Sequence, residues 1–322
     1  MYLMNFLNNY IILLILLNLM MVMLCIGFFT LLERKILSYI NLRKGPNKVG
    51  FLGIFQPFSD AMKLFLKEFN LINKSNYYIY MFSPIFLIFI MLMIWLLIPF
   101  KIYMISMNFN ILNLLCFMGL SVYFLMFSGW SSNSMYSLLG SIRSISQIIS
   151  YEVSLILIML SLIYMTEEYN FFMLIYYQEF MWFMMMMYLL GLIFFVSIMA
   201  ELNRTPFDLV EGESELVSGF NVDYMSSGFV LIFIYEYGMM IFMMFMYLMF
   251  FFATNYFYLF YYFKLLIFMN LIIWIRGTLP RIRYDKLMLL VWKSYLLISL
   301  NYLLLNLFFK KIFIMLMIYY FM

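Results

Sequence analysis

The amino-acid sequence predicts an all-α polytopic membrane protein with about eight transmembrane helices, a surface amphipathic helix and an inward-facing acidic loop. Of its 322 residues, 67% are hydrophobic and 11% are charged, whereas soluble globular chains are about 45–50% apolar and about 25% charged. The apolar runs are long and continuous, which favours helices over a barrel of alternating strands. The charged residues gather between these runs. We therefore expect residues 1–322 to form a single integral membrane domain.

The apolar runs approach the roughly 20 residues that a helix needs to cross a bilayer. We expect the spans to be Asn8–Leu32, Tyr80–Phe100, Ile111–Phe127, Gln147–Met165, Phe180–Met199, Gly228–Phe252, Phe257–Ile275 and Met288–Phe309. The last segment, Ile312–Met322, is too short to cross, and we expect it to lie along the membrane interface.

Basic residues predict the orientation of these spans. The loops after the first, third, fifth and seventh spans share one side. Of the 19 lysines and arginines, these loops hold all but four, namely Lys101, Lys264, Lys310 and Lys311. The positive-inside rule places these loops on the inner side of the membrane, matrix or cytoplasm, and both termini on the outer side.

The composition limits the chemistry that this chain can supply by itself. It contains no histidine, and its two cysteines, Cys25 and Cys116, lie inside apolar runs. We therefore expect no iron–sulfur cluster or His-ligated haem held by this chain alone. The sequence has no GxGxxG or Walker-type phosphate loop. Abundant Phe, Tyr, Met, Ile, Asn and Lys indicates an AT-rich gene of the kind found in organelles.

The first inward loop, Leu32–Phe69, combines a basic half with a predicted amphipathic helix. The basic half, from Arg34 to Lys48, should contact anionic lipid headgroups or an acidic partner. After Pro57, apolar residues recur at helical spacing on one face, namely Phe58, Met62, Phe65 and Phe69. We interpret this segment as a helix on the membrane surface, which is either an ordinary connector or part of a ligand entrance.

The second inward loop, Ser128–Gln147, is rich in serine and other small residues, which permit close helix approach. Glu152 follows it, near the start of the fourth span. A carboxylate at the centre of a span is unfavourable by about 2.5–3.5 kcal/mol, so we expect Glu152 to face the protein interior. Snorkelling to the interface is the alternative. Arg143 precedes Glu152 by about 13 Å along a continuous helix and is not necessarily its partner.

The third inward segment, Ala200–Tyr224, has the densest set of carboxylates in the chain: Glu201, Asp208, Glu211, Glu213, Glu215 and Asp223, against Arg204. Close carboxylates cannot all ionise freely, so some of them should hold protons near neutral pH. The run Thr205-Pro206-Phe207-Asp208 has the form of a capping box, so we expect a helix to begin there. That helix would place Glu211 and Glu215 on one face and turn Glu213 away. A solvated acidic surface is the alternative.

Two further features lie near the end of the chain. Glu236 falls well inside the sixth span and is a functional candidate, since intramembrane carboxylates usually are. The alternative is a neutral glutamic acid hydrogen-bonded to a tyrosine or a backbone carbonyl. The last inward loop should contact lipid headgroups or a soluble partner, because it carries Arg276, Arg281, Arg283 and Lys286 against Asp285.

Five long stretches, in order, resemble the quinone-site membrane subunits of respiratory complex I, the NADH:ubiquinone oxidoreductase. They are LLERKILSYINLRKGPNKVG, QPFSDAMKLFLKE, GWSSNSMYSLLGSIRSISQIISYEVSL, AELNRTPFDLVEGESELVSGFNVDY and WIRGTLPRIRYDKLM. Asn41, Ser144, Ser146 and Asp223 depart mildly from the family's pattern, and none of them removes a charged motif position.

The resemblance implies a core subunit of the proton-pumping complex in the mitochondrial inner membrane, with no redox centre of its own. Such a subunit encloses a ubiquinone chamber together with peripheral-arm subunits, and FMN and iron–sulfur clusters belong to partners. Other membrane subunits and lipids such as cardiolipin would be its neighbours, and nucleic acid would not. The resemblance assigns to the quinone chamber Arg34, Arg43, Phe58 and Asp60. It assigns to the proton path Glu152, Glu201, Asp208, Glu211, Glu213, Glu215 and Glu236. It implies no catalytic residue and no metal ligand.

Three alternatives stay open at the level of sequence. One is a stand-alone secondary ion transporter, although the inverted repeats and broken helices typical of such folds are not evident. Another is a purely structural anchor. The third is the homologous subunit of a membrane-bound hydrogenase or a chloroplast complex.

Overall fold

The computed structural model describes residues 2–68, 74–98, 108–179, 181–209, 219–221, 223–253 and 258–321. Every regular element in these ranges is a helix, so the predicted all-α class is confirmed. Within them, seven helices are long and apolar enough to cross a membrane, and α8 is a shorter apolar helix.

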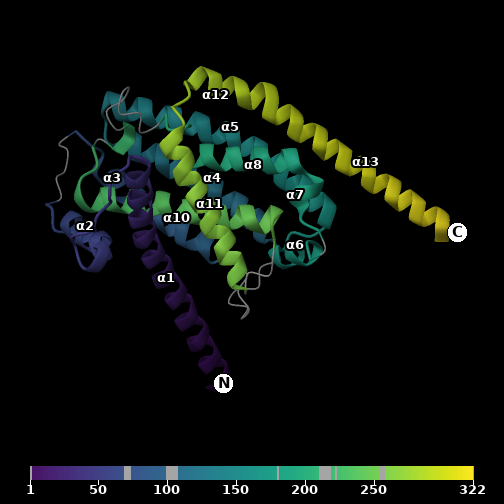
Figure 1. The fold of residues 1–322 in the computed structure, drawn as a ribbon, viewed down its shortest axis with the longest axis horizontal. Helices are drawn as coiled ribbons and strands as arrows, with labels where there is room; N and C mark the ends of the chain where they lie inside the picture. Colours follow the sequence, from purple (N-terminus) through teal and green to yellow (C-terminus); the bar gives the residue numbers. More distant parts are fainter. Residues whose placement is uncertain are drawn as a thin grey trace.

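The helices follow one another along the chain as Figure 1 shows. Their bounds are α1 Tyr2–Ile40, α2 Gln56–Phe65, α3 Tyr77–Trp95, α4 Asn110–Ser131, α5 Met135–Thr166, α6 Phe171–Tyr177, α7 Phe183–Met186, α8 Tyr188–Glu201, α10 Ser226–Phe251, α11 Leu259–Thr278, α12 Tyr284–Leu290 and α13 Leu296–Phe321. Short 3-10 turns, η1 and η2, cover Phe51–Gly53 and Gly219–Asn221. A π-helical turn, η3, covers Val291–Tyr295 and joins α12 to α13.

Helix α1 continues to Ile40, past its predicted end at Leu32. A helix satisfies its own backbone hydrogen bonds, so it does not have to stop where the apolar run stops. The extension places Glu33, Arg34 and Lys35 on a rigid helix rather than in a loop.

Helix α5 begins at Met135, well before the predicted start at Gln147, so most of the second inward loop is helical. The Ser134 side chain caps it by accepting a hydrogen bond from the Ser137 amide. The small residues bring α4 and α5 close together, as predicted: a Cβ added at Gly129 would lie 2.4 Å from the Cβ of Ser141.

The predicted fifth span and the chain end differ from the helices observed. The span Phe180–Met199 is divided at Met187 into α7 and α8, and α8 alone reaches only about 21 Å, less than the ~30 Å hydrocarbon core. The segment Ile312–Met322 is not separate from the last span in its described part, because α13 runs unbroken to Phe321. Its place along the membrane interface stays a prediction. No glycine or proline interrupts the apolar run, so nothing local ends the helix.

Helices α5 and α10 form the centre of the bundle. Helix α5 packs against α4, α8 and α13, and α10 packs against α1, α3 and α11. Helix α10 is the most deeply buried of the potential spans and α1 the least. The free ends of α1 and α13 project beyond the bundle in different directions (Figure 1). Exposed apolar side chains within the described parts of these helices, such as Leu16 and Phe308, suit a lipid or protein surround.

Candidate functional site

An apolar groove of about 400 Å³ lies between α1, α2 and α10. Each helix contributes side chains at helical spacing, so the groove follows from three amphipathic or apolar faces that meet. Its lining is almost entirely apolar, and the polar exceptions are Thr30, Arg34, Asp60 and Tyr237. Such a lining suits a largely apolar ligand with a few polar atoms.

Helix α2 closes one side of the groove. Pro57 lies in its first turn, where a missing N–H has no consequence. The ring of Phe58 packs edge-on against Phe28 of α1, with 5.9 Å between ring centroids. Asp60 forms an ion pair with Arg34 of α1. It also accepts a hydrogen bond of 2.9 Å from Nε2 of the Gln56 side chain. These contacts fix the surface helix against the first span.

Three of the four residues predicted for a quinone chamber therefore line one groove, namely Arg34, Phe58 and Asp60. Arg43 does not line it. Arg43 lies at an adjoining cavity of about 390 Å³, where Arg34 and Lys44 are its basic neighbours. The two cavities share Arg34, so an apolar surface and a basic surface meet at this side chain.

A buried charge cluster lies behind the groove. Tyr237 lines the groove, and its hydroxyl donates a hydrogen bond of 2.6 Å to the Glu33 carboxylate. Arg276 forms an ion pair with Glu33, and Arg204 lies 4.0 Å from the same carboxylate oxygen. The Arg204 guanidinium also stacks over the Tyr237 ring, 4.6 Å from its centroid. The cluster is stable because the buried carboxylate is paired and hydrogen-bonded.

Glu33 is not among the residues predicted for a site, because in the sequence it falls at the edge of the first inward loop. The signal that could have found it is a carboxylate directly after an apolar run, within the first span's helical register.

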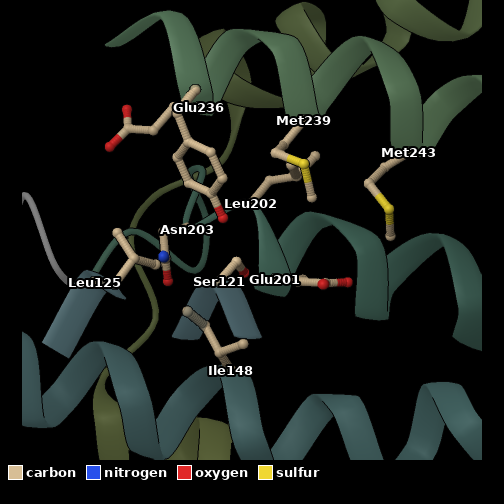
Figure 2. Close-up of a pocket in the computed structure, with 10 residues that line it drawn as sticks. Ser121, Leu125, Ile148, Glu201, Leu202, Asn203, Glu236, Met239 and Met243 are labelled. Atoms are coloured by element: carbon tan, nitrogen blue, oxygen red, sulfur yellow. The ribbon is translucent and has the colours of Figure 1, made fainter. Parts of the chain in front are cut away.

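A second, smaller cavity of about 30 Å³ lies on another side of α10. Figure 2 shows Glu201 from α8 and Glu236 from α10 at this cavity, with their carboxyl groups directed to opposite sides rather than toward each other. Asn203 and Ser121 add polar atoms to the lining. A polar cavity of this size has room for a water molecule.

Glu152 lies next to this cavity. One of its carboxylate oxygens is 3.3 Å from the position of a Cβ added at Gly119 of α4, so the side chain faces α4 rather than lipid, as predicted. Its charge is close enough to interact with Glu201. The structure therefore gathers Glu152, Glu201 and Glu236 around one region between α4, α5, α8 and α10.

The acidic stretch is only partly described. The helix predicted to begin at Pro206 does not begin there, since residues 205–209 form turns and irregular backbone. Asp208 forms an ion pair of 3.2 Å with Arg281, so a tertiary partner competes with the local capping box. The remaining predicted proton-path residues lie outside the described residues: Glu211, Glu213 and Glu215.

Comparison with known proteins identifies the family of this chain. The family model described as NADH dehydrogenase matches residues 12–307. The chain is 52% identical over 282 residues to the Aedes aegypti protein named NADH-ubiquinone oxidoreductase chain 1, which covers 88% of this chain and 90% of the relative. The Anopheles quadrimaculatus protein of the same name is 55% identical to this chain, over 88% of this chain and 90% of the relative. The Locusta migratoria protein of the same name is 50% identical, over 89% of this chain and 93% of the relative. This chain belongs to the NADH dehydrogenase family.

Proposed function

We propose that this chain is the core membrane subunit of a proton-pumping NADH:ubiquinone oxidoreductase, in which it helps to form the ubiquinone chamber and begins the acidic path for protons. One observation carries the proposal. Helix α10 presents Tyr237 to the apolar groove and the preceding residue, Glu236, to the acidic cavity. A single helix thus separates a site for an apolar substrate from half-buried carboxylates.

The chemistry of the groove supports ubiquinone as the substrate. The long apolar lining suits an isoprenoid tail, and the Arg34 guanidinium, which has more N–H donors than its contact with Asp60 uses, could donate a hydrogen bond to a carbonyl oxygen of the ring. The groove lies beside the surface helix α2, whose exposed apolar residues include Phe58 and Phe65. This placement suits entrance of the quinone from the bilayer.

The charge cluster supports a coupling role. Reduction of a quinone to a quinol takes two electrons and two protons, and the reduced ring is an anion until it is protonated. An anion near Tyr237 would be favoured by Arg204 and Arg276, which outnumber Glu33 in the cluster. The field of this quinone anion would strengthen proton binding by the carboxylates on the other side of α10. Protonation of the quinone would remove the anion and so relax that effect. Glu152, Glu201 and Glu236 would convert this change into proton movement.

The partners follow from the same proposal. Peripheral-arm subunits would supply the electrons through FMN and iron–sulfur clusters and would complete the chamber, and other membrane subunits would continue the proton path. The mitochondrial inner membrane is the proposed location. The cavity beside Arg43 and Lys44 would contact anionic headgroups such as those of cardiolipin.

The groove is tested by filling it in the assembled complex. Ala61 lines the groove and Met62, the next residue of α2, does not. Ala61→Phe should raise the KM for ubiquinone about tenfold, because overpacking by 1–3 kcal/mol is about that factor or more. Met62→Phe is the matched control and should leave KM unchanged. An unaltered KM in both variants would remove this groove from the quinone's route.

The acidic path is tested by Glu236→Gln and Glu152→Gln, with protons pumped per electron as the readout. We expect pumping to fall in both. Glu167→Gln is the control, since Glu167 is largely exposed and pairs with Lys310. Full pumping with unchanged turnover in Glu236→Gln and Glu152→Gln would exclude these two residues as carriers.

A further inference from the structure

One buried amide on α5 holds the turn that follows Glu201. Gln147 is fully buried. Its Nε2 donates one hydrogen bond of 2.8 Å to the Ala200 carbonyl oxygen and another of 2.8 Å to the Phe207 carbonyl oxygen. A single side chain therefore ties both ends of the loop between residues 200 and 207 to α5.

This attachment relates Glu201 to Glu152. Ala200 directly precedes Glu201, and Gln147 lies little more than one turn before Glu152 on α5. Glu152 is a residue of α5 itself, whereas Glu201 is held to this part of α5 through the hydrogen bond from the Gln147 side-chain amide to Ala200. Any shift of the Ala200 peptide moves Glu201 relative to Glu152.

The rest of the loop has a separate attachment. The Ile282 amide donates to the Pro206 carbonyl oxygen at 2.9 Å, and Arg281 pairs with Asp208. Loss of the Gln147 amide would therefore release the Ala200 carbonyl oxygen from α5, leaving it the Asn203 backbone N–H at 3.2 Å within its own turn, without releasing the segment around Asp208.

We infer that Gln147 is a positioning residue for proton transfer, which sets the separation and orientation of Glu201 relative to Glu152. The inference rests on the proposed function, since it matters only if these carboxylates carry protons. Proton transfer requires hydrogen-bond reach, directly or through one water. The cavity beside Glu201 has about 30 Å³, which is room for little more than a water, so a small displacement of Glu201 would decide whether one water can reach from it toward Glu152.

The test is Gln147→Met in the assembled complex. Methionine keeps the length and approximate volume of the side chain and removes both donors. We expect kcat for NADH:ubiquinone reduction to fall about tenfold, because displacements of ~1 Å can reduce rates by up to ~100-fold. The KM for ubiquinone should not change, since Gln147 does not line the groove, and fewer protons should be pumped per electron. Gln147→Asn, which keeps the amide, should recover part of kcat, and it serves in place of the methionine variant if that variant does not assemble.

The chain offers a matched control. Gln178 is equally buried, and its Nε2 donates to the Met249 and Phe250 carbonyl oxygens, both at 3.1 Å. It does not line the cavity at Glu201. Gln178→Met should reduce stability to a similar extent while leaving kcat and the proton ratio of the assembled complex unchanged.

A double variant separates the positioning role of Gln147 from the proposed proton path itself. Gln147→Met should cause no further loss of kcat in a Glu201→Gln background, because both changes act on the same carboxylate. Full pumping by Glu201→Gln alone would count against the proposed proton path. If Glu201→Gln stops pumping, then normal kcat and pumping in Gln147→Met, or an equal defect in Gln178→Met, would overturn the positioning role alone.

Discussion

At the scale of single residues, the decisive groups are buried polar side chains that distant parts of the chain satisfy. Glu33 is hydrogen-bonded and ion-paired by Tyr237 and Arg276, which lie far away in the sequence. Gln147 and Gln178 each bind backbone carbonyls that belong to other elements. Removing one partner from such a group leaves the others buried without compensation, which is more unfavourable than losing an exposed contact.

Glu33→Gln should destabilise the protein by about 3–5 kcal/mol, because it leaves the charges of Arg204 and Arg276 without their buried counterion. Asp285→Asn is the control. It removes an ion pair with Arg283 in which both side chains are largely exposed, so the change should stay within about 1 kcal/mol. Thermal unfolding of the complex in mild detergent measures both. Similar melting temperatures for the two variants would contradict a structural role for the buried cluster.

Tyr224 gives a prediction for pH. Its ring stacks on Tyr80 at 4.3 Å between centroids, and its hydroxyl lies 3.1 Å from the Ser83 hydroxyl. Burial raises the pKa of Tyr224 above its ordinary value, while hydrogen bonds from Ser83 and Ser131 lower it in part and the Asp223 charge raises it further.

A tyrosine with a raised pKa in the folded state contributes stability that is complete below the unfolded pKa of about 10 and is lost as pH rises above it. Tyr224→Phe should therefore lower stability by about 1 kcal/mol near neutral pH. The variant should also lose less stability than the unchanged protein as the pH rises above about 10. Melting temperatures from pH 8 upward measure this. If the curves of the two proteins stay parallel, Tyr224 does not titrate differently on unfolding.

At the scale of elements, helix ends and helix contacts determine where the site forms. Helix α1 carries Glu33 and Arg34 beyond the apolar run, so one rigid element serves both the groove and the buried cluster. Helix α10 separates the groove from the acidic cavity. The contact of α4 with α5 determines where Glu152 lies, because its carboxylate rests against Gly119.

The α4–α5 contact is tested with two glycines. Gly129→Ala would place a Cβ 2.4 Å from the Ser141 Cβ and should destabilise the protein by about 1–3 kcal/mol through overpacking. Gly27→Ala is the matched control in α1, since its nearest neighbour, the Pro57 Cβ, would be 3.8 Å away in ordinary contact. Assembly yield and melting temperature should fall only for Gly129→Ala. Equal loss in both variants would indicate that helix propensity, rather than close approach, accounts for the effect.

At the scale of the whole molecule, the chain presents a large apolar surface and two cavities on different sides of α10. An apolar exterior of this kind is stable in lipid or against other membrane helices. The basic residues Arg43 and Lys44 lie next to the groove, at the level where headgroups or partner subunits would meet it. The site described is therefore one wall of a larger assembly under the proposed function.

Affinity purification through this chain in mild detergent should recover the remaining oxidoreductase subunits together with NADH:ubiquinone activity. The physical reason is that quinone reduction under the proposal needs electrons from partner subunits. Harsher detergent that removes those subunits should abolish the activity of the fraction holding this chain. Transport or turnover by the isolated chain would instead favour the stand-alone transporter.

The sequence by itself determined the all-α membrane class and the approximate spans, because the length and spacing of apolar runs identify the helices. The grouping of Arg34, Phe58 and Asp60 came only from the resemblance to a known family, since no local pattern relates a residue of α1 to residues of α2. The sequence could not determine the ends of α1, α5 and α13, since a helix can continue past the apolar run that identifies it. Only the tertiary structure placed Arg43 in a separate cavity, paired Glu33 with Arg276, and joined Gln147 to Ala200. These contacts join residues far apart in the chain, and the packing of whole helices, rather than any local pattern, brings them together.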